Sequence, residues 1–229
     1  MSSMNALESE VHKCILCKPK YCEIMPFPPV YSFGDPAGKP VILIGLNPSR
    51  KEFEAKKGKR FLSISENAED RRACQLSYFE RKPHTYFKNV VQFFEGAAKK
   101  KLGYKKIPWE KVGVLDLVKC ATVIEEGQWS ELSDGQQDEL IENCERHLIK
   151  QLKLYSPRVV IPYGVDVCKW FRANDPQNSL SKKDPIDGYT TFKAIIEGET
   201  FHGLYVPQRQ GPHSKPEIEW VQTELARLL

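Results

Sequence analysis

The stretch VILIGLNPS at residues 41–49 gives the clearest structural signal in the chain. Five of its first six residues are apolar, and the two Ile and one Val among them favour a strand that is buried on both faces. The run ends where Gly45 and Asn47 tolerate unusual backbone angles and Pro48 removes a hydrogen-bond donor. Polar groups that follow a central strand of an open α/β sheet point into the usual ligand crevice. Residues 45–49 are therefore interpreted as either a plain exit loop or one wall of a ligand site.

Further segments extend this strand into a larger fold. Apolar runs predict two more buried strands at residues 112–118 (VGVLDLV) and 158–164 (RVVIPYG), and a hairpin at residues 189–196 and 200–206. Helices are predicted over residues 86–101, 135–155, 165–171 and 217–229. The alternation of strands with helices predicts the α/β class, with a mainly parallel sheet covered by helices on both sides.

The composition is typical of one globular domain. The chain has 229 residues, of which 41% are hydrophobic and 28% charged, and its formal net charge is +4. No apolar run approaches the roughly 20 residues that span a bilayer, and the N-terminus lacks a basic-then-apolar leader. We therefore expect a cytoplasmic protein without a membrane partner. Two basic groups, at residues 56–60 and 99–106, have the density that neutralises phosphates, although such groups are as common on a solvated surface.

The seven cysteines suggest metal ligation. An odd number in a cytoplasmic chain argues against a disulfide framework. Two cysteines form a C-x2-C pair on the irregular segment 11–35, one follows the second strand, and one lies on the long helix. These candidate ligands, which suit zinc or an iron–sulfur cluster, are Cys14, Cys17, Cys120 and Cys144. Cys22 is an alternative ligand, and Cys74 and Cys168 are interpreted as small buried hydrophobes.

Several segments, taken in order, resemble the uracil-DNA glycosylase superfamily, and in particular its iron–sulfur-containing family four. They are CILC at residues 14–17, VYSFGDPAGKP at 30–40, LVKC at 117–120, and CERHL, QL and PRVV within 144–160. The resemblance implies a three-layer α/β/α sandwich around a mainly parallel four-stranded sheet. It implies that residues 1–229 form one domain on which the cysteine-bearing segment 11–35 is docked. It also implies a [4Fe-4S] cluster, with zinc as the alternative metal, on Cys14, Cys17, Cys120 and Cys144.

The first motif, GLNPS at residues 45–49, departs from the G-E-A-P-G of family four. It looks like the G-x-N-P loop of the mismatch-specific and single-strand-selective branches. The resemblance gives Asn47 the role of positioning the attacking water, places Gly45 and Leu46 in the base pocket, and gives Ser49 a contact to the DNA backbone. An amide can orient water beneath C1′ but cannot deprotonate it, so we expect weaker catalysis than with an Asp.

A second motif of the H-P-S type is expected before the last helix, where the chain has GPHSKP at residues 211–216. His213 is the candidate to stabilise the negative charge on the departing base, and Ser214 and Lys215 are candidates to contact backbone phosphate. The order P-H-S leaves open a histidine without catalytic duty. Phe61, in the sequence GKRF, resembles the aromatic residue that stacks on the flipped base, and a core phenylalanine is the alternative.

Asp116, within the second strand, is the most informative departure from family four, which has Asn there. The Asn amide donates to O4 of uracil and accepts from N3–H, whereas an ionised Asp only accepts. An ionised Asp116 would suit an exocyclic amine or the N1–H of a deaminated purine better, unless burial raises its pKa. The alternative is an Asp that caps the neighbouring loop.

The resemblance and these candidate residues together imply a monofunctional DNA glycosylase in base excision repair. It would hydrolyse the N-glycosidic bond of a flipped damaged or deaminated base, either uracil or a related deaminated base. No lysine lies in a recognisable Schiff-base context, which argues against a lyase step. The expected partner is DNA, with no obligate protein partner, so we expect a monomer associated with the nucleoid. One alternative is a non-catalytic DNA-binding member that retains the fold and the cluster. Another is an unrelated α/β protein whose cysteine-bearing segments are held together by a zinc ion and which has a small-molecule pocket.

Overall fold

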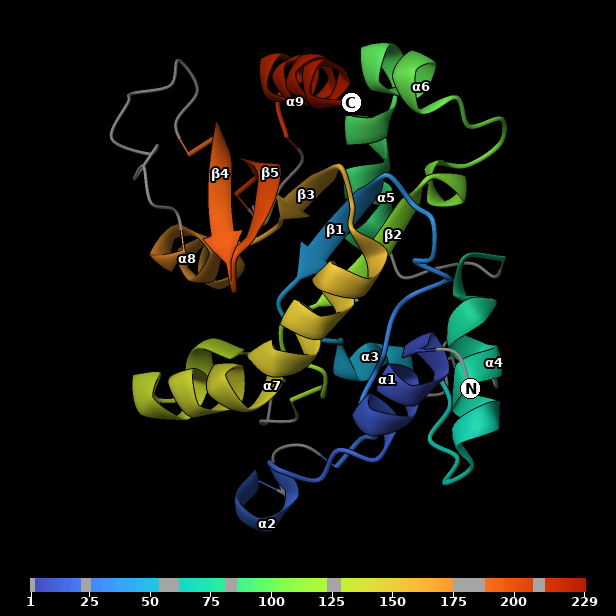
Figure 1. Ribbon diagram of the computed structural model, residues 1–229, viewed down its shortest axis with the longest axis vertical. Helices are drawn as coiled ribbons and strands as arrows, with labels where there is room; N and C mark the ends of the chain where they lie inside the picture. Colours follow the sequence, from blue (N-terminus) through green and yellow to red (C-terminus); the bar gives the residue numbers. More distant parts are fainter. Residues whose placement is uncertain are drawn as a thin grey trace. The chain divides into compact units, whose positions relative to one another are not determined.

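The computed structural model describes residues 3–21, 26–53, 62–80, 86–122, 129–174, 188–207 and 213–229 (Figure 1). The chain divides into two compact units, each built from three separate stretches. Unit 1 comprises Met1–Asp35, Asn47–Pro83 and Leu115–Leu154, and unit 2 comprises Pro36–Leu46, His84–Val114 and Tyr155–Leu229. That the chain forms one domain with a docked cysteine-bearing segment stays a prediction. Within the described ranges, no helix is both long enough and apolar enough to span a bilayer.

Five strands form one sheet in the order β2-β1-β3-β5-β4. They are β1 (Val41–Gly45), β2 (Val112–Asp116), β3 (Val159–Pro162), β4 (Thr190–Ile196) and β5 (Glu199–Tyr205). β3 runs parallel to both β1 and β5, and β4 runs antiparallel to β5 (Figure 1). The predicted α/β fold with a mainly parallel sheet is confirmed. The predicted number of four strands is wrong, because the hairpin adds both of its strands to the sheet.

Unit 2 is built around the central strands. Val41 to Ile44 and Val159 to Ile161 are fully buried, as their continuous apolar sequences predict. Gly203 lies opposite Val160, where a Cβ atom would come within 2.2 Å of the Val160 carbonyl oxygen. The close approach of β3 and β5 therefore requires glycine at this position.

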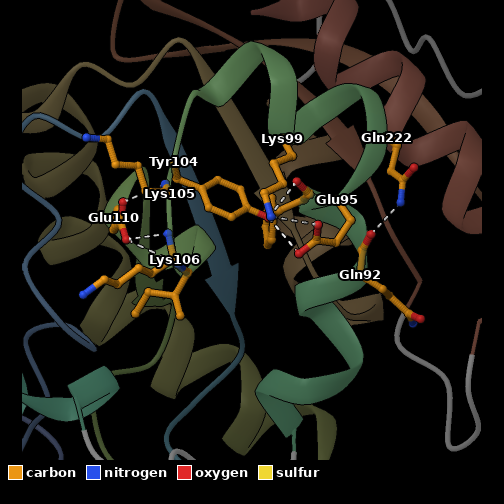
Figure 2. A network of polar contacts seen from close by, with 10 residues as sticks. Gln92, Glu95, Lys99, Tyr104, Lys105, Lys106, Glu110 and Gln222 are labelled. Carbon is orange, nitrogen blue, oxygen red and sulfur yellow. Dashed lines mark hydrogen bonds and ion pairs between the residues drawn. The ribbon is translucent and has the colours of Figure 1, made fainter.

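Helices of unit 2 pack on this sheet and on one another. They are α5 (Tyr86–Val91), η2 (Gln92–Phe94), α6 (Gly96–Leu102), η3 (Pro108–Glu110), α8 (Val165–Ala173) and α9 (Lys215–Leu228). The prediction of one helix over residues 86–101 is wrong, because Glu95 is extended and Gly96 has a φ of +57°. Figure 2 shows how α9 is tied to the broken segment: the Gln222 amide donates to the Gln92 carbonyl oxygen at 2.7 Å.

Unit 1 contains the remaining helices. They are α1 (Ser3–His12), α2 (Lys18–Tyr21), α3 (Arg50–Phe53), α4 (Ala68–Leu76), η1 (Tyr78–Glu80), η4 (Trp129–Glu131) and α7 (Asp134–Tyr155). The predicted long helix at 135–155 is confirmed by α7, and the irregular segment 11–35 contains the short helix α2. Backbone and amide hydrogen bonds order this segment: the Val30 N–H donates to the Lys119 carbonyl oxygen at 2.7 Å, and the Gln151 amide donates to the Tyr31 carbonyl oxygen at 2.8 Å.

Candidate active site

Asn47 follows β1 at its carboxyl end, as the strand-to-loop sequence predicts. Its side chain is half-buried, and its amide nitrogen donates to the hydroxyl oxygen of Thr122 at 3.2 Å. Thr122 is fully buried. Within the described part of the chain, no hydrogen bond reaches the Asn47 amide oxygen. The arrangement therefore holds the amide by its donor and leaves its acceptor available to orient a water molecule.

Ser49 lies just before α3 and uses its polar atoms within the loop. Its hydroxyl accepts from the Lys51 N–H at 3.3 Å, and its carbonyl oxygen accepts from the Glu52 N–H at 3.0 Å. The side chain is half-buried. Its predicted contact to a DNA backbone stays a prediction, while the observed bonds show that it begins the short helix.

Glu52 is a buried carboxyl five residues beyond Asn47. Tyr78 donates its hydroxyl to one carboxyl oxygen at 2.6 Å, while the other has no hydrogen-bond partner among the described residues. The Glu52 pKa is raised to about 8, chiefly by burial and to a smaller extent by the charge of Asp116. The hydrogen bond from Tyr78 acts in the opposite direction and lowers this pKa. Glu52 is therefore neutral at pH values where an exposed glutamate is ionised.

Asp116 ends β2 and is also buried, with 6% of its surface exposed. One carboxyl oxygen, Oδ2, has no hydrogen-bond partner within the ranges that the structure describes. Burial raises the Asp116 pKa to about 7, although the Lys119 ammonium opposes the shift. Because a protonated carboxyl both donates and accepts, Asp116 can present the same two functions as an asparagine amide.

A buried lysine supports the end of β2. The Lys119 ammonium donates to the Asp116 carbonyl oxygen and, at 2.6 Å, to the Gln151 amide oxygen. Burial lowers the Lys119 pKa to about 8, against the opposing effect of the Asp116 charge. These bonds join β2 to α7 and fix the backbone from which the Asp116 side chain projects.

The four predicted cysteine ligands line one small cavity in unit 1, together with Phe27, Pro29 and Lys119. Cys14 and Cys120 are partly exposed, whereas Cys17 and Cys144 are buried. The Cys144 pKa is lowered to about 7, chiefly by a hydrogen bond from the Cys17 thiol. Burial acts in the opposite direction and raises this pKa, whereas the Lys119 N–H, 3.5 Å from the Cys144 sulfur, lowers it further. Where the structure describes the chain, no three His, Cys, Asp or Glu side chains are arranged around a single metal ion. Cys22 lies outside the described residues.

His213 belongs to unit 2 and is buried between two tyrosines. Its Nδ1 atom is hydrogen-bonded to the Tyr189 hydroxyl, and its Nε2 atom lies 3.3 Å from the Tyr163 hydroxyl. Phe93 packs edge-on against the imidazole, with ring centroids 4.8 Å apart. A neutral imidazole offers one donor and one acceptor, which matches two hydroxyl partners. The two tyrosines and Phe93 therefore fix the plane of the ring.

The other predicted residues of the second motif are exposed. Ser214 precedes α9, and its N–H donates to the Glu217 carboxylate at 2.6 Å. Lys215 begins α9, with its ammonium 3.8 Å from the Glu219 carboxylate. Phe61 lies outside the described residues, as do residues 54–60 and 208–212.

The predicted site residues are distributed over both units. Asn47 and Asp116 lie in unit 1, as do the four cysteines, and His213 lies in unit 2. Sequence reasoning missed Thr122, Glu52 and the two tyrosines around His213. A usable signal existed for Tyr163, which directly follows a buried strand, and for Thr122, which follows the apolar run 112–118.

These features define an α/β protein with a mainly parallel sheet and polar side chains beyond the carboxyl ends of β1 and β3. The family model of the uracil DNA glycosylase superfamily matches residues 31–211, and the chain belongs to this superfamily. The match includes Asn47, Asp116 and two of the four cysteines. No curated protein matches the chain.

Proposed function

We propose that this chain is a DNA glycosylase that hydrolyses the N-glycosidic bond of a flipped, deaminated or damaged base. The observation that carries the proposal is Asn47, whose amide is held by Thr122 at the end of β1 in a chain of this superfamily. A flipped base is the form in which an enzyme of this class reaches the bond between base and sugar. DNA is accordingly the proposed partner.

Asn47 would position the attacking water. With its nitrogen donating to Thr122, its oxygen can accept a hydrogen bond from a water molecule and aim that water at C1′. The amide does not take the proton, so most of the acceleration comes from stabilising the leaving base. The proposed loop resembles the G-x-N-P type, on a chain whose other motifs resemble iron–sulfur family four.

His213 would stabilise the negative charge that develops on the departing base. To donate to that base, one ring nitrogen exchanges a tyrosine hydroxyl for a base oxygen. The bond between Nε2 and Tyr163, at 3.3 Å, is the longer of the two contacts and the one we expect to be exchanged. Tyr189 then holds Nδ1 and keeps the ring in place.

Asp116 would read the edge of the base. Because burial raises its pKa to about 7, the carboxyl is protonated in slightly acidic solution. In that form it donates to a base carbonyl and accepts from an adjacent ring N–H, which is the pattern of uracil O4 and N3–H and of the O6 and N1–H of a deaminated adenine. When ionised, it only accepts, and recognition of either edge weakens.

A [4Fe-4S] cluster is the proposed cofactor, on Cys14, Cys17, Cys120 and Cys144. The donor set fits: four cysteines line one cavity, and the Lys119 N–H points to the Cys144 sulfur, where it stabilises a thiolate. When bound, such a group cross-links the chain segments that carry its ligands, and the base-release step does not use it. A zinc ion is the alternative occupant.

The test is a base-release assay on duplexes and single strands that carry uracil, hypoxanthine, xanthine or a mismatched thymine. We expect the full chain to release at least one of them, and Asn47→Ala to lower the single-turnover rate by about 100-fold. Asn89→Ala, which changes an exposed asparagine on α5, is the matched control and should keep the wild-type rate.

Absence of a covalent adduct between enzyme and DNA on borohydride treatment would support a monofunctional enzyme. If no base is released but DNA binds, the chain is the non-catalytic binding member instead.

A further inference from the structure

A basic cavity lies in unit 2, beside the residues that precede β1, β2 and β3. Its volume is about 420 Å³, and its lining includes Lys39, Lys101, Lys111 and Arg158. Leu102 and Tyr155 supply apolar and aromatic surface to the same cavity. This volume is in the range of small-ligand pockets, about 300–1,000 Å³. None of these residues belongs to the proposed glycosylase site.

The sheet topology brings these cations together. β1 and β3 are parallel with Val41 opposite Val159, so the residues that precede them are neighbours, and the Arg158 N–H donates to the Pro40 carbonyl oxygen at 2.9 Å. Lys39 precedes Pro40 in the chain. Lys111 precedes β2, which lies next to β1 in the sheet, and Lys101 comes from the last turn of α6. Three of the four charges thus come from segments that lead into neighbouring strands of the sheet, and the fourth comes from α6.

The side chains that line the cavity carry net positive charge. Among the ten lining residues, all in the described part of the chain, four are Lys or Arg and none is Asp or Glu, and Leu229, the last residue of the sequence, is also in the lining. The nearby Glu110 carboxylate accepts from the backbone N–H groups of Lys105 and Lys106, both at 3.0 Å (Figure 2). The Glu110 carbonyl oxygen accepts from the Lys39 ammonium at 2.7 Å.

Three of the four cations have no ion pair within the described ranges: Lys101, Lys111 and Arg158. All three side chains are exposed and can reorient toward a ligand. Like charges gathered around a concave surface repel one another, and an anion relieves that repulsion. An arginine fork and several lysines are the usual combination for phosphate groups.

We propose that this cavity binds a ligand with adjacent phosphate groups. Four cations match the charge of about two phosphates, each of which carries between one and two negative charges near neutral pH. The cavity is separate from the proposed site of base release. Within unit 2, Arg158 precedes β3 and Tyr163, which contacts His213, follows it, so these two residues lie about 16 Å apart along the strand.

The probe is inorganic tripolyphosphate, titrated into the full chain by calorimetry at low salt. We expect Lys111→Gln with Arg158→Gln to weaken binding at least about tenfold, because each removed cation takes away a charge-assisted hydrogen bond. Lys105→Gln with Lys106→Gln removes the same charge from exposed residues outside the lining and should change the affinity less than about twofold. Thermal unfolding of both variants checks that they fold.

Two results would overturn the proposal. One is that the wild-type chain does not bind tripolyphosphate at millimolar concentration. The other is that the two double variants lose affinity for tripolyphosphate equally. The loss would then follow from the net charge of the protein and not from the cavity. The turnover number for base release is unaffected in the cavity variant if the sites are separate, so failure of this proposal and failure of the glycosylase proposal give different results.

A second arm identifies the source of the phosphates. A short duplex without a damaged base is tested for displacement of tripolyphosphate and for its affinity to the cavity variant. If the duplex displaces tripolyphosphate and also binds the cavity variant more weakly, the site is assigned to a nucleic-acid backbone. The logarithm of the duplex association constant should then fall with the logarithm of the salt concentration, with a slope of about 0.9 for each phosphate contacted. Tripolyphosphate binding that the duplex does not displace assigns it to a small phosphorylated compound.

Discussion

Thr122 determines how the Asn47 amide faces its surroundings, since the hydrogen bond between them fixes the amide nitrogen. Replacement of Thr122 by Val preserves shape and burial but removes the acceptor. We expect Thr122→Val to slow base release about tenfold, because a misoriented amide no longer aims the water, while Thr122→Ser keeps the rate. Single-turnover assays measure both, and unfolding midpoints within a few degrees of the wild type exclude a folding defect. A wild-type rate in Thr122→Val would show that Asn47 is oriented by something else.

Asp116 links base recognition to pH. Its pKa is raised from an ordinary 3.8 to about 7, so the carboxyl is mostly protonated near pH 6 and mostly ionised near pH 8. We expect release of uracil or hypoxanthine to fall roughly tenfold over this interval, in proportion to the protonated fraction. Asp116→Asn, which always donates and accepts, should give a flatter profile and a higher rate near pH 8.

The same pair of pH profiles separates Asp116 from Lys119, whose pKa is about 8. Lys119 is present in both proteins, and loss of the Asp116 charge lowers its pKa further, so a slope that belongs to Lys119 would persist at lower pH in Asp116→Asn. An unchanged base preference and an unchanged slope in this variant would contradict the role given to Asp116.

At the scale of single residues, the sequence predicted positions better than chemical states. Asn47 follows a strand whose buried character is clear from VILI, and β-sheet geometry puts such residues at the rim of a site. The protonation of Asp116 depends on burial by residues distant in sequence, which no local pattern contains. The tyrosine partners of His213 are likewise 24 and 50 residues away along the chain.

At the scale of elements, the approach of β3 to β5 depends on Gly203. A Cβ atom there would lie 2.2 Å from the Val160 carbonyl oxygen and 2.5 Å from the Phe192 ring. We expect Gly203→Ala to lower the free energy of unfolding by about 1–3 kcal/mol, because backbone cannot move aside as a side chain can. Denaturant unfolding measures the change.

Gly135, near the start of α7, is the matched control, since a Cβ atom there meets nothing within 4 Å. Gly135→Ala should leave the stability unchanged or raise it by up to about 1 kcal/mol. Equal losses in the two variants would mean that the strand contact is not what makes Gly203→Ala costly.

Elements with strong periodicity were predicted well, and breaks within them were not. The apolar positions of residues 86–101 continue at helical spacing through Gly96, so the pattern does not show that the helix ends and restarts there. What breaks it is a positive φ at one glycine, which is a property of backbone conformation and not of hydrophobic pattern. The short helix α2 was missed because four residues carry too little periodicity to register.

At the scale of the whole molecule, the cysteine cavity joins chain segments far apart in sequence. Cys14 and Cys17 precede β1, Cys120 follows β2, and Cys144 lies on α7, yet all four line the same cavity. A group that ligates them closes long loops, and its binding free energy then adds to the free energy of folding. Loss of one ligand should therefore affect the stability of the entire chain.

We expect the full chain, reconstituted with iron and sulfide, to hold about four iron atoms and to absorb near 400 nm, as a general property of such clusters. Cys144→Ser should lose most of the iron and unfold at a lower temperature than the wild type. Cys74→Ser is the matched control, because Cys74 is also a buried cysteine but lies outside the cavity. It should retain the iron and change the unfolding temperature only by the cost of one buried hydroxyl. Retention of iron in Cys144→Ser, or equal loss in both variants, would contradict the assignment of this cavity as the cluster site.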